Sequence, residues 1–201
     1  AIVLVWLGEW PFTIFIALLS AIMCIEWAKL SAASSKWISR VMPVAAVSAV
    51  LMLQFGYVAV AMGIVVAGAI LIWGLAKRDA VDDIMLTIFG VLYVSVAGMS
   101  LAWLRNLPEN GLETVSWLVG IVIAMDIGAY AAGRTFGGPK MAPKISPGKT
   151  WSGLLGGATC AGGVAVVAAM NSGQSALFAF AVLGVFLGLA AQGGDLIESA
   201  L

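Results

Sequence analysis

Apolar segments long enough to cross a lipid bilayer dominate this chain of 201 residues. A spanning helix needs about 20 mostly apolar residues. We expect spans at residues 11–30, 41–54, 57–76, 84–104, 112–133, 151–170 and 175–201, with residues 1–8 as the end of a truncated helix. Only 10% of the residues are charged, against about 25% in a typical soluble domain. The sequence therefore predicts an all-α fold, a polytopic transmembrane helix bundle of about seven spans plus the truncated first helix.

The basic residues are distributed unevenly between the junctions of these segments. If every segment spans, nine of the ten Lys and Arg residues lie at alternate junctions, and only Arg105 lies at the others. The positive-inside rule assigns the basic side to the cytoplasm. We therefore expect an integral membrane protein whose basic loops face the cytoplasm. The net charge of zero offers no basic field that would attract a polyanion, which excludes nucleic acid as a partner.

The longest polar stretch runs from residue 133 to 150 and reads GRTFGGPKMAPKISPGKT. Its basic residues are Arg134, Lys140, Lys144 and Lys149. Cationic side chains, the backbone N–H groups of a tight loop and the N-terminus of the following helix all favour an anion such as phosphate. A loop that contacts lipid headgroups explains the same composition. The final Gly-Lys-Thr is not a P-loop, because that motif needs glycine where Pro143 stands and a preceding strand, which we do not expect here.

Three acidic residues lie in otherwise apolar segments: Asp126, Asp195 and Glu198. A charge near the bilayer centre costs roughly 2.5–3.5 kcal/mol on insertion scales, so such acids are candidates for function. Asp195 and Glu198 are three residues apart and share one helix face, beside Ser199. Carboxylates and hydroxyls with a few waters suit Mg²⁺, which commonly bridges nucleotide phosphates. Ion pairs between these acids and the loop lysines are the structural alternative. The chain has no histidine, so any chemistry depends on carboxylates, cations and hydroxyls.

Four strings of residues, taken together, give a specific signal. They are Asp126-Ile-Gly-Ala-Tyr130, Gly133-Arg-Thr-Phe-Gly-Gly138, Lys144-Ile-Ser-Pro-Gly-Lys-Thr-Trp151 and Gly194-Asp-Leu-Ile-Glu-Ser199. In order and spacing they resemble phosphatidate cytidylyltransferase, also called CDP-diacylglycerol synthase. The resemblance covers residues 120–201, and the earlier segments match it only in hydropathy and in a Glu-Trp pair.

The resemblance implies an enzyme that condenses CTP with phosphatidic acid to CDP-diacylglycerol and pyrophosphate, in phospholipid biosynthesis. It implies a bacterial inner-membrane protein with its active site facing the cytoplasm. The residues it assigns to catalysis are Asp195, Lys149 and Ser199; to substrate binding, Lys144, Ser146, Lys149 and Arg134; and to Mg²⁺, Asp126, Asp195 and Glu198.

We expect a single transmembrane domain, 1–201, in which N-terminal helices occupy residues 1–119 and an incomplete catalytic part occupies 120–201. The family's further C-terminal signature, which includes a Gly-His-Gly-Gly stretch, is absent, so we expect a chain truncated at both ends. A homodimer is one expected assembly. Two alternative functions are a CTP-dependent polyprenol kinase-like enzyme and a transporter with an ion site on the cytoplasmic side. A transporter predicts polar residues through the full membrane depth, whereas here they gather at one side.

Overall fold

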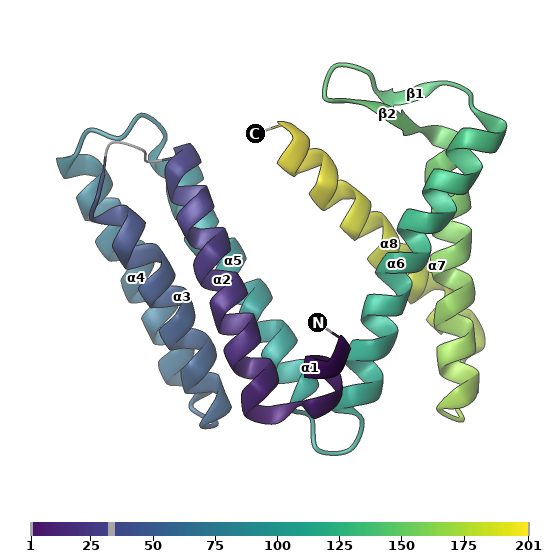
Figure 1. Cartoon of the computed structure of the whole chain (residues 1–201), viewed down its shortest axis with the longest axis horizontal. Coiled ribbons are helices and arrows are strands. Elements are labelled where there is room, and N and C mark those ends of the chain that lie inside the picture. Colours follow the sequence, from purple (N-terminus) through teal and green to yellow (C-terminus); the bar gives the residue numbers. More distant parts are fainter. Residues whose placement is uncertain (1, 32–34, 201) are drawn as a thin grey trace. The chain divides into compact units, whose positions relative to one another are not determined.

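The computed structural model describes residues 2–31 and 35–200, which form eight helices and one β-hairpin (Figure 1). The helices are α1 (Ile2–Leu7), α2 (Glu9–Ser31), α3 (Ile38–Gln54), α4 (Val58–Arg78), α5 (Ile84–Arg105), α6 (Gly111–Phe136), α7 (Trp151–Asn171) and α8 (Leu177–Ala200). The strands are β1 (Lys140–Ala142) and β2 (Ser146–Thr150). Within these ranges six helices are long and apolar enough to cross a membrane, and α3 is a shorter apolar helix. The predicted polytopic helix bundle is confirmed.

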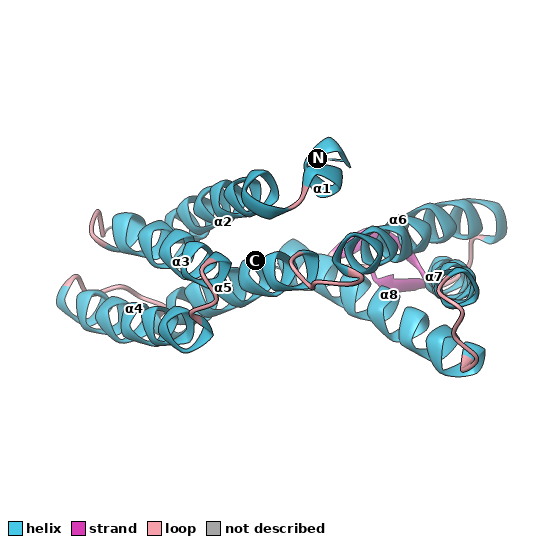
Figure 2. Cartoon of the chain, turned by 90° about the horizontal axis from the view of Figure 1, so that it is seen from below, coloured by secondary structure: helices cyan, strands magenta, loops and turns pink. Residues whose placement is uncertain are grey.

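The chain divides into two compact units, Ala1–Val115 and Ser116–Leu201. In the first unit, helices α2 to α5 pack around a core of small and aliphatic side chains. Trp27 ties α2 to α5, because its indole Nε1 donates a hydrogen bond to the Leu86 carbonyl over 2.9 Å. Figure 2 shows these four helices side by side.

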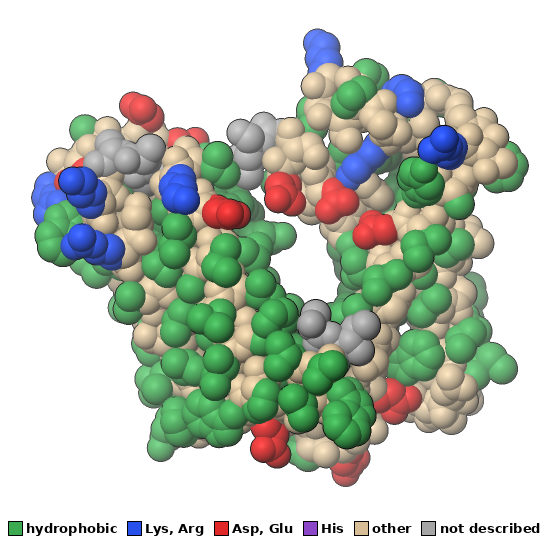
Figure 3. All heavy atoms as spheres, in the orientation of Figure 1, with side chains coloured by type: hydrophobic (Ala, Val, Ile, Leu, Met, Phe, Trp, Pro, Cys, Tyr) green, Lys and Arg blue, Asp and Glu red, His purple; other side chains and the backbone are tan. Residues whose placement is uncertain are grey.

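A polar contact holds the basic end of the first unit. Ser35, only 1% exposed, donates its hydroxyl to the Asp79 carboxylate over 2.6 Å and accepts the N–H of Ile38 over 3.2 Å. Asp79 also accepts a hydrogen bond from the Arg78 guanidinium at 2.8 Å. The chain before α3 is thereby joined to the end of α4. In Figure 3, Lys and Arg side chains gather over this end, while hydrophobic side chains cover the lengths of the helices.

In the second unit, small residues let three helices approach closely. A Cβ at Gly153 would lie 2.8 Å from the Ala129 carbonyl oxygen of α6, and one at Gly157 would lie 2.6 Å from that of Met125. On the α8 side, a Cβ at Gly184 would lie 2.7 Å from the Ala161 carbonyl oxygen. Such contacts leave no room for side chains, so α7 uses Gly153 and Gly157 to pack against α6 and Ala161 to pack against α8.

A β-hairpin occupies much of the polar stretch between residues 133 and 150. Gly137 and Gly138 have φ angles of 59° and 104°, and this backbone geometry, which favours glycine, carries the chain out of α6. Strands β1 and β2 then pair antiparallel, with Lys140 opposite Thr150. The expectation that no strand precedes the Gly-Lys-Thr string was wrong, because these residues end β2 and β1 lies before them. This stretch has no alternating pattern of apolar residues, which is the signal that would have indicated a strand.

Candidate active site

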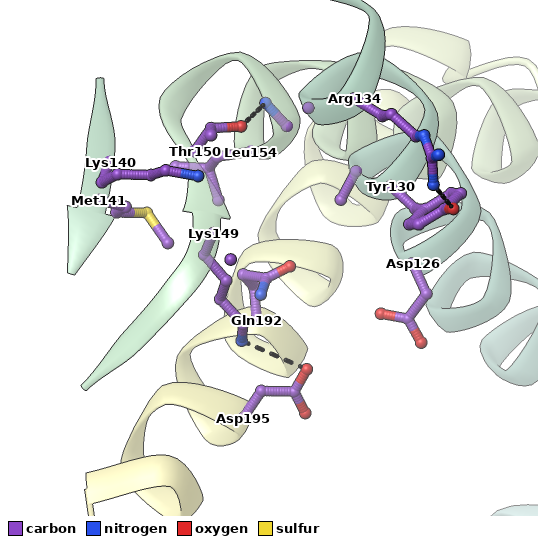
Figure 4. Close-up of a pocket in the computed structure, with 14 residues that line it drawn as sticks. Asp126, Tyr130, Arg134, Lys140, Met141, Lys149, Thr150, Leu154, Gln192 and Asp195 are labelled. Carbon is purple, nitrogen blue, oxygen red and sulfur yellow. Dashed lines mark hydrogen bonds and ion pairs between the residues drawn. The ribbon is translucent and has the colours of Figure 1, made fainter. Parts of the chain in front are cut away.

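A cavity of about 570 Å³ lies in the second unit where α6, the hairpin, α7 and α8 meet (Figure 4). It is lined by Asp126, Ala129, Tyr130, Gly133, Arg134, Lys140, Met141, Gly148, Lys149, Thr150, Gly153, Leu154, Gln192 and Asp195. Three cationic and two anionic side chains are among these residues, which leaves the cavity with one net positive charge. A concave pocket in which polar groups converge is the first candidate for a small-molecule binding site.

Helix α6 supplies one wall through residues spaced by four. Asp126, Tyr130 and Arg134 share one face of the helix because residues four apart lie above one another. The Arg134 guanidinium donates a hydrogen bond to the Tyr130 hydroxyl over 2.6 Å, and its Cζ atom lies 5.8 Å from the centre of the Tyr130 ring. Asp126 forms no ion pair with any residue in the described ranges. Its carboxylate therefore faces the cavity without a competing cation.

The hairpin and α8 contribute one positive and one negative side chain, which form an ion pair. The Lys149 ammonium on β2 lies 3.4 Å from the Asp195 carboxylate on α8. The Lys149 side chain is 21% exposed and that of Asp195 is 57% exposed, so Asp195 remains accessible to a ligand. This contact brings the C-terminal part of α8 to the hairpin end of the unit. Ion pairs between the loop lysines and the acids of the apolar segments were one of the two explanations that the sequence offered. The Lys149–Asp195 contact confirms one such pair.

Thr150 joins the hairpin to α7 and is 6% exposed. Its backbone is extended, with φ −119° and ψ 156°, and its hydroxyl accepts the N–H of Gly153 over 3.1 Å as a helix N-cap. The N–H of Trp151 donates to the Pro139 carbonyl over 3.2 Å, and the Ser152 hydroxyl donates to the Gly137 carbonyl. Two of the first N–H groups of α7 are thus already occupied. An anion in the cavity would therefore be bound mainly by the charged side chains of the lining, and less by free N–H groups at the start of α7.

The structure brings together four of the eight residues that the sequence assigned to the site. Asp126, Arg134, Lys149 and Asp195 line the cavity. The other four lie outside its lining: Lys144 in the turn of the hairpin, Ser146 at the start of β2, and Glu198 and Ser199 near the end of α8. The Ser199 hydroxyl donates to the Asp195 carbonyl oxygen over 2.7 Å, so it is engaged by the backbone of its own helix.

The carboxylates of Asp126 and Asp195 are the groups in the cavity lining that could bind Mg²⁺. Within residues 2–31 and 35–200, no three acidic or cysteine side chains come close enough to hold a metal ion by themselves. Mg²⁺ is usually bound by only one or two carboxylates together with waters and substrate phosphates. Asp126 and Asp195 match this donor set for an ion that arrives with a nucleotide. The expected third ligand, Glu198, is exposed and is not part of the lining.

Comparison with known proteins gives the family. The family model described as the cytidylyltransferase family matches residues 1–201. The chain belongs to the cytidylyltransferase family. This confirms the resemblance found in the sequence and extends it, because the matching region includes the N-terminal helices as well as residues 120–201.

Relatives of this chain are found in several bacteria. The phosphatidate cytidylyltransferase of Brucella suis is 34% identical over 202 residues, which cover 98% of this chain and 72% of that protein. That of Mycobacterium tuberculosis is 32% identical over 144 residues, 64% of this chain and 44% of that protein. That of Haemophilus influenzae is 42% identical over 76 residues, 36% of this chain and 26% of that protein. No solved structure matches the chain significantly.

Four polar residues of the cavity received no specific role from the sequence: Tyr130, Lys140, Thr150 and Gln192. Tyr130 lies four residues before Arg134, a spacing that predicts contact on a helix. Gln192 lies three residues before Asp195 in an apolar segment, which marks it as a polar group on the same face. Lys140 belongs to the basic stretch that we expected to favour an anion, but its place in the lining depends on the pairing of β1 with β2.

Proposed function

We propose that the protein transfers the cytidylyl group of CTP to phosphatidic acid, yielding CDP-diacylglycerol and pyrophosphate. The observation that carries this proposal is the cavity of the second unit, in which a lysine–aspartate pair, a second aspartate and two further cations converge in a chain of the cytidylyltransferase family. The related proteins of Brucella and Mycobacterium bear the name of this activity. An apolar helix bundle supplies the membrane setting that a diacylglycerol lipid needs.

The chemistry is a displacement at the α-phosphorus of CTP. An oxygen of the phosphatidate phosphate forms a new bond to this phosphorus, and the bond to the bridging oxygen breaks, so pyrophosphate leaves with its electron pair. Little covalent chemistry is required of the protein, because positioning and charge neutralisation supply most of the catalysis of phosphoryl transfer. The attacking phosphate is already an anion, so a chain without histidine can perform the step.

Each charged residue of the cavity has a role in this displacement. Lys149 binds the phosphates of the nucleotide, and Asp195 holds the Lys149 ammonium in position. Arg134 and Lys140 neutralise the charge of the second phosphate-bearing substrate or of the departing pyrophosphate. Asp126 and Asp195 would hold Mg²⁺, which neutralises phosphate charge when it is bound.

Isotope labelling of CTP distinguishes this reaction from its alternatives. Purified full-length protein in detergent is incubated with phosphatidic acid and CTP labelled at either the α- or the γ-phosphate. A cytidylyltransferase moves the α-label into the lipid and releases the γ-label as pyrophosphate. A CTP-dependent lipid kinase would move the γ-label into the lipid, and a transporter would move neither. Either of these results would refute the proposal.

A further inference from the structure

A neutral amide, Gln192, lies in the cavity wall among charged side chains. Gln192 is only 7% exposed and lines the cavity from α8, about one helical turn before Asp195. Figure 4 shows its amide group directed into the cavity. Within residues 2–31 and 35–200, no hydrogen bond joins this amide to another residue. Gln192 is therefore a buried side chain with unused hydrogen-bond donors and an unused acceptor.

The amide of Gln192 has no protein partner, yet neither of its polar atoms is among the fully buried unpaired atoms of residues 2–31 and 35–200, so both remain accessible to water or to a ligand. A leucine of similar size would fill the same space on α8 but would present no hydrogen-bonding group there. No contact within the described ranges therefore accounts for glutamine at this position. An amide that stays unpaired until a ligand enters the cavity would explain why residue 192 is a glutamine and why its side chain is directed into the cavity.

Three other polar side chains of the cavity already have partners. Lys149 pairs with Asp195, Arg134 donates to Tyr130, and the Thr150 hydroxyl caps α7. Gln192 shares the face of α8 that carries Asp195, the partner of Lys149, so it lies on the side of the cavity where phosphate would bind. A neutral donor there binds a phosphate oxygen without adding a cation that would compete with Lys149 for Asp195.

We propose that Gln192 is a substrate-binding residue whose amide N–H groups donate to a phosphate oxygen of the nucleotide beside Lys149. This assignment rests on the proposed function, since it takes the cavity to be the nucleotide site. It predicts that the amide contributes to ligand binding and contributes nothing to the stability of the unliganded protein.

The test compares Gln192→Leu and Gln192→Glu with the parent, all as purified full-length protein in detergent with Mg²⁺. Thermal unfolding is measured without ligand, with pyrophosphate, and with CTP. Without ligand, Gln192→Leu should melt at the parent's temperature or above it. The affinity of this variant for pyrophosphate, and for CTP, should fall at least about tenfold. Gln192→Glu has nearly the same shape but lacks the donor and adds a negative charge, so it should bind pyrophosphate even more weakly.

Gln174→Leu is the matched control, because Gln174 is exposed in the connection between α7 and α8 and does not line the cavity. It should keep the affinities of the parent. If Gln192→Leu melts below the parent and binds pyrophosphate normally, the residue is structural and the inference is wrong. If the variant loses affinity for CTP but not for pyrophosphate, the amide contacts the base or ribose, and the phosphate assignment is wrong. If the parent itself binds neither ligand, the proposed function fails together with the inference.

Discussion

At the scale of single residues, the cavity depends on charges that belong to different elements. Lys149 comes from a strand and Asp195 from a helix 46 positions later, yet their charged atoms lie 3.4 Å apart. The pair is partly exposed, and exposed ion pairs contribute only about 0–1 kcal/mol to folding. The charges at these positions therefore matter more for binding an anion than for holding the second unit together.

Replacing Lys149 by alanine should impair the handling of phosphate while leaving folding intact. In the full-length protein, kcat/KM for CTP should fall at least about tenfold, equivalent to roughly 1.4 kcal/mol of lost transition-state stabilisation. The melting temperature should stay close to the parent's. Lys149→Arg should restore only part of the activity, because a forked guanidinium is larger than a compact ammonium. Lys144→Ala should lose less than Lys149→Ala, since Lys144 lies in the hairpin turn outside the cavity; equal losses would contradict this geometry.

Asp195→Asn should lower CTP-dependent formation of CDP-diacylglycerol by orders of magnitude in a protein that still folds. The change removes both the partner of Lys149 and a carboxylate suited to Mg²⁺. Glu198→Gln tests the sequence-based metal set against the structure, because Glu198 is exposed and absent from the lining. Assays over a range of Mg²⁺ concentrations should show a large defect for Asp195→Asn and a small one for Glu198→Gln. Normal turnover of Asp195→Asn at ordinary Mg²⁺ would refute the metal assignment.

Asp79 provides a pH-dependent contribution to the stability of the first unit. The hydrogen bond from Arg78, and then that from Ser35, lowers the pKa of the Asp79 carboxyl below its ordinary value. Since the folded state has the lower pKa, the contribution is fully present above the unfolded pKa of about 3.9 and is lost as the pH falls through the folded pKa. Asp79→Ala should therefore lower the melting temperature at neutral pH, and its difference from the parent should shrink below about pH 4. Asp82→Ala, at an exposed neighbour, is the control and should change little at any pH.

At the scale of elements, the close contact of α6 with α7 positions the cavity walls. Gly157→Ala should destabilise the protein, since the new Cβ would lie 2.6 Å from the backbone oxygen of Met125 and would push the helices apart. Gly163→Ala lies on the same helix with no atom within 4 Å of the new Cβ. It should be neutral or slightly stabilising, because alanine is better in helices by about 1 kcal/mol. Thermal unfolding in detergent measures both. Equal melting temperatures for the two variants would show that the helices can separate at no cost.

At the scale of the whole molecule, the orientation in the membrane follows from the distribution of charge. The 26 residues of α6 extend over about 39 Å, which exceeds the hydrocarbon core of about 30 Å. Thr135 near its end and Asn110 just before its start should therefore lie on opposite sides of the bilayer. We expect a cysteine at Thr135 to react only with reagents on the cytoplasmic side, and one at Asn110 only with reagents outside, in a background without Cys24 and Cys160. Labelling at Thr135 from outside intact cells would put the cavity on the wrong side for CTP.

The sequence by itself determined the spans and the family. Each span is specified by its own apolar composition, because a lipid bilayer forces every segment within it to satisfy its backbone hydrogen bonds internally. Prediction of the helices thus needs no knowledge of their neighbours, and the predicted span 84–104 corresponds to α5 (Ile84–Arg105). Asp126 and Asp195 could likewise be recognised, since a charge in an apolar segment is costly wherever that segment lies.

Only the tertiary structure decided which polar residues meet. The pairing of β1 with β2 brings Lys140 to the cavity and leaves Lys144 in the turn, although both lie in the same basic stretch. The rotation of α8 turns Gln192 and Asp195 toward Lys149, while Glu198 falls outside the lining. Strand register and helix rotation are set by packing between segments that are distant along the chain, such as Gly157 against Met125. The energy of that packing depends on both partners, so neither local sequence alone can specify it.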